Sequence, residues 1–123
     1  MPTASTTSTT FPEVHGCTSG NALDRSAPAD DRTVTFVAYE YTPKCIRIAA
    51  GQTVTFSGLF ESHPLVGGEV VGVDQIPDPS SPIPPTSTGT MKAVPFENGG
   101  VFPFYCDFHG AALGMFGAVL VNP

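Results

Sequence analysis

The chain has 123 residues, a length that suits one domain with a hydrophobic core but not two. Only 13% of its residues are charged, while Gly and Pro number 13 each, which favours turns and short strands over long amphipathic helices. The net charge of -6 and the lack of a basic stripe argue against a nucleic-acid partner, and no apolar run reaches the length of a transmembrane segment.

Residues 1–12 are rich in Ser and Thr, and we expect them to form a flexible leader ahead of one domain at 13–123. The first residues lack the apolar stretch of a signal peptide. Polar tracts of this kind often follow the cleavage site of exported or lipid-anchored proteins. We therefore expect the mature form of an exported protein, with an added initiating Met, in the periplasm or another extracytoplasmic compartment. A lipid anchor attached ahead of the leader is one arrangement that these features allow.

Three cysteines cannot all pair with one another. We expect a disulfide between Cys17 and Cys45, which leaves Cys106 free, and a structural disulfide indicates an oxidising compartment. The alternative is three reduced, buried thiols in a cytosolic protein.

The segment 11–31 is turn-rich, with a short helix or turn expected around 21–25. His15 has no other potential ligand within a few residues apart from Cys17, so we interpret it as a surface or packing histidine.

Alternating apolar and polar residues predict three strands in succession, at 33–41, 45–49 and 53–57, with Pro43 ending the first. The residues expected on the core side are Val34, Phe36, Ala38, Ile46, Ile48, Val54 and Phe56. Short strands at regular spacing indicate a sandwich or a barrel.

The remainder of the chain shows loops and further short strands, without internal repeats and without a pattern for a long helix. In order, we expect a loop at 58–68, a strand at 69–73, a Pro-rich surface loop at 75–89, a strand at 90–94, a turn at 97–100 and strands at 101–105 and 116–121. The sequence therefore predicts an all-β, Greek-key β-sandwich of about seven to eight strands.

The loop between the last two strands carries three potential metal ligands of different kinds, Cys106, His109 and Met115. A thiolate, an imidazole and a thioether suit a copper ion that cycles between Cu(I) and Cu(II), provided that a second imidazole joins them. His63 is the candidate, since its loop is expected at the same end of the sandwich. Zinc is the alternative metal, although the sequence lacks the paired Cys-x2-Cys ligand motifs of structural zinc sites.

The pattern Cys-x2-His followed by Gly-Met-x-Gly and an apolar strand resembles the cupredoxins, type 1 blue copper proteins such as plastocyanin, pseudoazurin, amicyanin and halocyanin. The upstream pattern is also similar to theirs, with Tyr41-x-Pro43, Ile46 and Ile48, and Gly51-x-x-Val54-x-Phe56 before the histidine. The likeness covers about 33–121. It implies one copper ion, with His63, Cys106 and His109 as equatorial ligands and Met115 as the axial ligand.

This chain departs from the family pattern at two positions. Five residues separate His109 from Met115, where four are common, so the extra residue could leave Leu113 or a backbone carbonyl beneath the metal in place of the thioether. A methionine packed in the core is the other reading of Met115. Pro64 stands where many members have an Asn that links the two ligand loops, so this link is absent or comes from another group such as Ser62.

The resemblance also implies an apolar patch around His109, at which a redox partner docks transiently. Its expected members are Pro64, Leu65, Gly110, Ala111, Ala112 and Leu113. No catalytic pair and no open metal position stand out, so we predict a monomeric electron carrier between a donor and an acceptor protein, not an enzyme. The alternatives are an exported copper chaperone or storage protein and a metal-free immunoglobulin-like binding module.

Overall fold

A computed structural model describes residues 10–123, so that most of the predicted leader lies outside the described part of the chain. Within these residues ten strands and one short helix follow in the order β1 (Leu23–Asp24), β2 (Thr33–Val37), β3 (Glu40–Thr42), β4 (Cys45–Ala49), β5 (Gln52–Ser57), β6 (Leu65–Val71), β7 (Asp74–Pro77), β8 (Met91–Phe96), β9 (Gly100–Cys106), α1 (Gly110–Leu113) and β10 (Phe116–Asn122).

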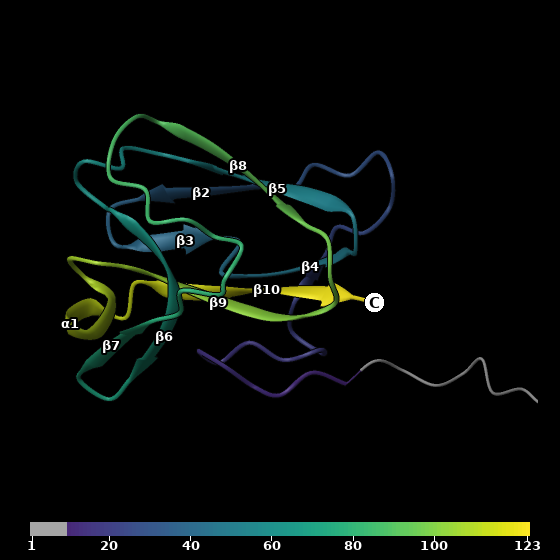
Figure 1. The fold of residues 1–123 in the computed structure, drawn as a ribbon, viewed down its shortest axis with the longest axis horizontal. Coiled ribbons are helices and arrows are strands. Elements are labelled where there is room, and N and C mark those ends of the chain that lie inside the picture. Colours follow the sequence, from purple (N-terminus) through teal and green to yellow (C-terminus); the bar gives the residue numbers. More distant parts are fainter. Residues whose placement is uncertain (1–9) are drawn as a thin grey trace, which may run out of the picture.

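The strands form two sheets that pack as a sandwich, as the sequence predicted (Figure 1). One sheet has six strands in the order β1-β4-β10-β9-β6-β7, and the other has four in the order β3-β2-β5-β8. The number of strands exceeds the predicted seven to eight for three reasons. β1 lies in a segment expected to be a helix or turn, β3 was merged with β2 in one predicted strand, and β7 lies mostly in the predicted Pro-rich loop. No helix within residues 10–123 is long and apolar enough to cross a membrane.

The core lies between the two sheets and contains the alternate residues that the sequence pattern selected. Val34 and Phe36 of β2, Ile46 and Ile48 of β4, and Val54 and Phe56 of β5 are all buried in one cluster. Burial of such a side chain stabilises the fold by roughly 1.5–3 kcal/mol. This packing gives the stiff support from which the loops at one end of the sandwich project.

The predicted strand at 33–41 is wrong as a single element, because the chain reverses within it. Ala38 adopts a left-handed conformation with φ of 59°, and β3 then pairs antiparallel with β2, placing Tyr41 opposite Phe36. Both rings are buried, although five residues apart they would face opposite sides of one continuous strand. Ala38 is consequently exposed in the turn, and Tyr39 lies beside it at the end of the sandwich.

The segment after His63 also differs from its prediction. The strand predicted at 69–73 begins earlier, as β6, and a hairpin follows in which β7 forms the edge of the larger sheet. Pro77 is tolerated there because an edge strand has a side without hydrogen-bonding partners. The Pro-rich loop is therefore shorter than predicted, and it is not wholly a surface loop, since Ile83 is buried in the core.

A disulfide joins Cys17 to Cys45, as predicted, and holds the N-terminal segment against β4. The segment expected to form a helix or turn contains β1 instead, parallel to β4. Phe11 is only 8% exposed and packs with Cys17 and Leu120. The packed domain therefore includes Phe11, two residues ahead of the predicted boundary at residue 13.

Candidate metal centre

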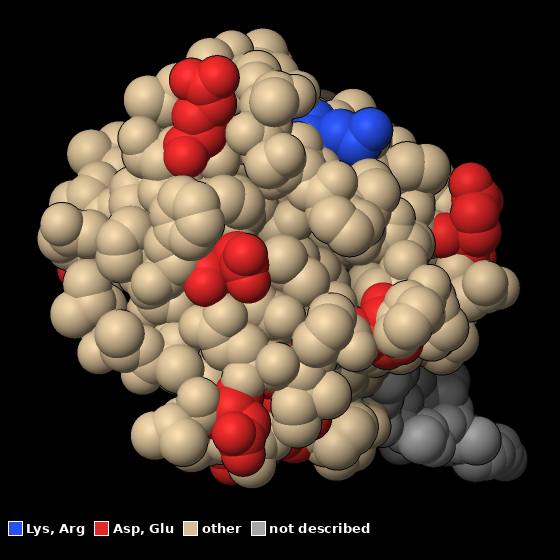
Figure 2. Space-filling model, turned by 60° about the vertical axis from the view of Figure 1, so that its left-hand side comes forward, with Lys and Arg blue, Asp and Glu red and all other residues tan. Residues whose placement is uncertain are grey.

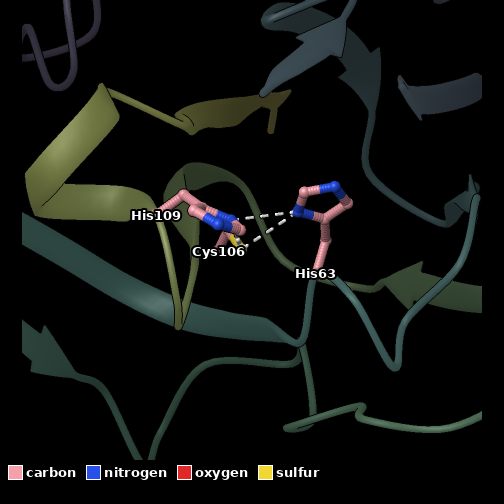
Figure 3. Close-up of side chains that lie close together, drawn as sticks. All are labelled: His63, Cys106 and His109. Carbon is pink, nitrogen blue, oxygen red and sulfur yellow. Dashed lines mark hydrogen bonds between the residues drawn. The ribbon is translucent and has the colours of Figure 1, made fainter. Parts of the chain in front are cut away.

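Three side chains with metal-binding atoms meet at the end of the sandwich that carries α1. His63 lies in the loop between β5 and β6, Cys106 is the last residue of β9, and His109 immediately precedes α1. Their ligand atoms all lie within 4.8 Å of one another. In Figure 3 both imidazole rings turn a nitrogen toward the other ring and toward the sulfur. Residues 46 positions apart in sequence are thus brought together as predicted.

The three atoms form a compact triangle. The Nδ1 atoms of His63 and His109 are 3.1 Å apart, and Cys106 Sγ lies 3.7 Å from the first and 3.5 Å from the second. A point equidistant from these atoms is about 2.0 Å from each, close to metal–nitrogen and metal–sulfur bonds of roughly 2.0–2.3 Å. The donor set therefore fits one metal ion.

The protonation states of Cys106 and His63 also bear on how these side chains bind a cation. Burial raises the pKa of the Cys106 thiol, although backbone N–H groups of Phe108 and His109 donate to the sulfur and oppose this rise. The pKa of His63 is lowered by burial and, to a smaller extent, by the neighbouring His109. The neutral imidazole is the form that binds metal, and a metal cation compensates for the cost of a buried thiolate.

The two ligand loops are linked through the main chain of Pro64. Its carbonyl oxygen accepts a hydrogen bond of 2.8 Å from the Asp107 N–H, directly after the cysteine. Leu65 then pairs with Cys106 across β6 and β9. A main-chain hydrogen bond therefore joins the two loops at the position where the sequence left their link absent or supplied by another group such as Ser62.

Met115 returns to a position opposite Cys106 despite the extra residue in the loop. The Cys106 N–H donates to the Met115 carbonyl oxygen at 2.9 Å, and the next pair along the ladder is Tyr105 with Phe116. Residues directly opposite on antiparallel strands point to the same face, and both side chains are fully buried in one cluster. The intervening residues include α1, and Gly114 caps the C-terminus of this helix in a left-handed conformation with φ of 71°. Axial ligation by Met115 stays a prediction.

The predicted apolar patch needs correction in three of its six members. Pro64 and Leu65 are buried, and Leu65 is one of the side chains of the core. Gly110 is also buried, with Tyr105 and Gln75 packed against it. These three residues therefore present no surface, whereas Ala112 and Leu113 are exposed and Ala111 is half-buried.

Two exposed aromatic residues beside the triad were missed by the sequence analysis. The ring centroid of Tyr39 lies 4.8 Å from that of His109 and 6.0 Å from that of His63, while half of its side chain is exposed. Phe108, also exposed, lies edge-on to His109 at 6.3 Å. The position of Phe108 between two ligands was a usable signal, but nothing in the local pattern placed Tyr39 near the metal centre.

The side of the molecule that carries α1 and the β6–β7 hairpin comes forward in Figure 2 and is largely uncharged. Separate acidic side chains lie on it, with few basic ones. This distribution agrees with the net charge of -6. This face is thus uncharged over most of its area and carries more acidic than basic side chains.

A scan against models of protein families found no match, and a search of curated protein sequences found no relative. Solved structures with a similar fold include amicyanin from Paracoccus versutus, with 22% identity and a TM-score of 0.51 over 82% of this chain and 90% of that one. Pseudoazurin from Methylobacterium extorquens has 22% identity and a TM-score of 0.50 over 73% of each chain. A copper-containing nitrite reductase from Thermus scotoductus has 24% identity and a TM-score of 0.51, over 74% of this chain but only 22% of that one.

Proposed function

The chain has the cupredoxin fold, and from this premise we propose that it is a blue copper protein that carries one electron between redox partners. The observation that carries the proposal is the triangle of His63, Cys106 and His109, whose dimensions fit a single ion. Bound copper would supply the one-electron Cu(I)/Cu(II) chemistry. The similar enzyme is much longer than this chain, and its activity is not part of the proposal.

The proposed ligands are Nδ1 of His63 and of His109, the Cys106 thiolate and the Met115 thioether. The cross-strand position of Met115 opposite Cys106 supports its place in this set. Burial of both sulfur-bearing residues excludes water from their side of the site. Ligands held by a β-sandwich move little when the charge of the site changes, which favours rapid electron transfer.

His109 is the proposed exit for the electron, because its ring is half-buried and lies among exposed apolar side chains. We propose a docking surface made of Tyr39, Phe108, Ala112 and Leu113 around this ring. A partner with a complementary positive charge would be attracted by the net charge of -6 and would make a small, transient contact. The proposed setting is extracytoplasmic, in keeping with the disulfide, and the proposed carrier is a monomer.

A copper titration followed by visible absorption and paramagnetic resonance tests the proposal. We expect an intense thiolate-to-copper charge-transfer band with one copper per chain, and its complete loss in Cys106→Ser. Tight Cu(I) binding with little colour after oxidation would favour a chaperone or storage protein. Absence of copper binding would favour a metal-free module, and exclusive binding of zinc would also contradict the proposal.

The axial ligand is tested separately with Met115→Leu. We expect the blue colour to persist and the reduction potential to shift, because the axial position tunes the potential without forming the main charge-transfer bond. Met91→Leu is the matched control, since Met91 is 67% exposed in β8. Equal spectra and potentials in the two variants would contradict axial ligation by Met115.

A further inference from the structure

The side chain of Gln75 crosses from β7 to the ligand loop and binds it on both sides of His109. Its Nε2 donates to the carbonyl oxygen of Asp107 at 2.9 Å, and its Oε1 accepts from the Ala111 N–H at 2.9 Å. A longer contact of 3.5 Å joins Nε2 to the Asp107 carboxylate. One amide group is thus hydrogen-bonded to both ends of the five-residue segment 107–111, which has His109 at its centre.

The ligand loop needs support of this kind because its own regular structure is minimal. α1 has only 4 residues, and no side chain caps its N-terminus. A helix of one turn is not stable by itself, since the cost of nucleation exceeds the gain from one or two hydrogen bonds. The bonds to Gln75 tie the loop to β7, which is in turn paired with β6 through Val70 opposite Gln75. In Figure 1, α1 lies beside these two strands.

Gly110 shows how closely the amide approaches the loop. A Cβ atom built there would lie 3.0 Å from Gln75 Oε1 and 3.2 Å from Tyr105 Cβ. A larger residue would therefore push against Gln75 on one side and the tyrosine on the other. The glycine that follows His109 gives the loop enough room to lie against the amide.

We propose that Gln75 is a positioning residue for His109, which fixes the imidazole before the metal binds and while the metal is bound. The inference rests on the proposed function, which supplies the metal. Across the triad, the Tyr39 ring contacts the same histidine from the β2–β3 turn. The histidine is therefore held by β7 through the main chain of Asp107 and Ala111, and its ring is contacted by Tyr39.

The chain offers a matched control in Gln52, whose side-chain amide makes the same two kinds of bond, one to an N–H and one to a carbonyl oxygen. Gln52 Oε1 accepts from the Ala49 N–H at 2.8 Å, and its Nε2 donates to the Ser26 carbonyl oxygen at 2.9 Å. Gln52→Ala therefore removes equivalent hydrogen bonds at the start of β5. Gln75→Glu retains an acceptor for Ala111 while losing the donor to Asp107.

The first experiment uses the copper-free protein, so that it does not depend on the proposed function. We expect Gln75→Ala to increase amide hydrogen exchange of Ala111 about tenfold, the effect of losing about 1.4 kcal/mol of hydrogen-bond energy, with a smaller change in Gln75→Glu. We also expect weaker nuclear Overhauser contacts between the rings of Tyr39 and His109. Gln52→Ala should affect exchange at Ala49 only. Unchanged exchange at Ala111 or unchanged ring contacts in Gln75→Ala would overturn the inference.

The second experiment uses the copper-loaded protein. We expect Gln75→Ala to bind copper about tenfold more weakly and to change its paramagnetic resonance spectrum, since outer partners of metal ligands have effects of this size. Gln52→Ala should match the wild type in both measurements. Wild-type affinity and spectrum in Gln75→Ala would overturn a positioning role. Failure of the wild type to bind copper would instead contradict the proposed function, while the copper-free experiment still decides whether Gln75 positions His109.

Discussion

The three histidines of this chain differ in what their ring nitrogens face. Nδ1 of His63 and of His109 faces the Cys106 sulfur. Both nitrogens of His15 are instead used by the main chain, because Nδ1–H donates to the Gly117 carbonyl oxygen at 2.9 Å and Nε2 accepts from the Val70 N–H at 2.8 Å. His15 thus joins β10 to β6 and stacks on Phe116, as a packing histidine.

The neutral form of His15 is required for these two bonds, and this leads to a pH dependence of stability. Burial lowers its pKa below the ordinary 6.5, against smaller raising effects of the Gly117 carbonyl and of Glu69, and with a small lowering effect of Lys44. The stabilisation is fully present above about pH 6.5, where the unfolded histidine is neutral, and is lost as the pH falls toward the lower folded-state pKa.

We therefore expect the free energy of unfolding of the copper-free protein to fall more steeply between pH 7.5 and 5 in the wild type than in His15→Gln. Urea unfolding at several pH values measures the free energy of unfolding of both proteins. The other titratable groups contribute equally to both, so their effects cancel in the difference. Parallel curves for the two proteins would show that His15 does not titrate differently on folding.

At the scale of elements, the ligand loop requires a particular backbone conformation as well as particular ligand residues. Gly114 caps the C-terminus of α1 with φ of 71°, and its N–H donates to the Gly110 carbonyl oxygen at 3.0 Å. This left-handed residue lets the chain return into β10 with Met115 opposite Cys106. Gly72 in the β6–β7 turn has a similar φ of 63°, in open space and away from the triad.

We expect Gly114→Ala and Gly72→Ala each to lower the free energy of unfolding by about 1 kcal/mol, the usual cost of a side chain in this conformation. Only Gly114→Ala should also alter the visible spectrum of the copper-loaded protein, because Met115 is the next residue. Chemical unfolding and absorption spectra measure the two effects. An unchanged spectrum in Gly114→Ala would mean that the loop adapts without moving the ligand.

Elements with regular alternation were predictable from the sequence, and those that depend on a local reversal were not. The strands around Ile46 and Val54 follow from period-two burial. The last strand follows instead from a continuous apolar run, and its residues are buried on both faces. The reversal at Ala38 has no Gly, Asn or Pro to indicate it, so the pattern continued through the turn.

The three residues of the triad were recognisable as candidate ligands because their chemistry is visible in residue types, which do not depend on register. The surface around them was not, since burial of Leu65 depends on its pairing with Cys106 across β6 and β9. The contact of Tyr39 with His109 and the hydrogen bonds of Gln75 to the ligand loop depend likewise on how distant elements pack at one end of the sandwich.

At the scale of the whole molecule, the net charge and the uncharged surface act on different steps of a transient encounter with a redox partner. The net charge of -6 acts over roughly a Debye length, about 8 Å at physiological ionic strength, and the uncharged surface acts only on contact. Acidic side chains are spread over the face in Figure 2, so the field attracts a positively charged reactant without fixing one orientation.

We expect the copper-loaded protein to react faster with a small cationic redox complex at low ionic strength, with the rate falling several-fold between about 0.01 M and 0.15 M. The rate with an anionic complex of similar potential should rise over the same range. Stopped-flow absorption measures both reactions. The same salt dependence for both reactants would show that the overall charge does not steer the encounter.

The disulfide and the buried third thiol together constrain the order of events after synthesis. Cys17 and Cys45 lie on the N-terminal segment and β4, while Cys106 ends β9 at 0% exposure. Because this residue has no exposed surface in the folded chain, we expect a bulky thiol reagent to react with it only after unfolding. We likewise expect wrong pairing to arise in the unfolded chain, so that the fold keeps this sulfur free for a metal.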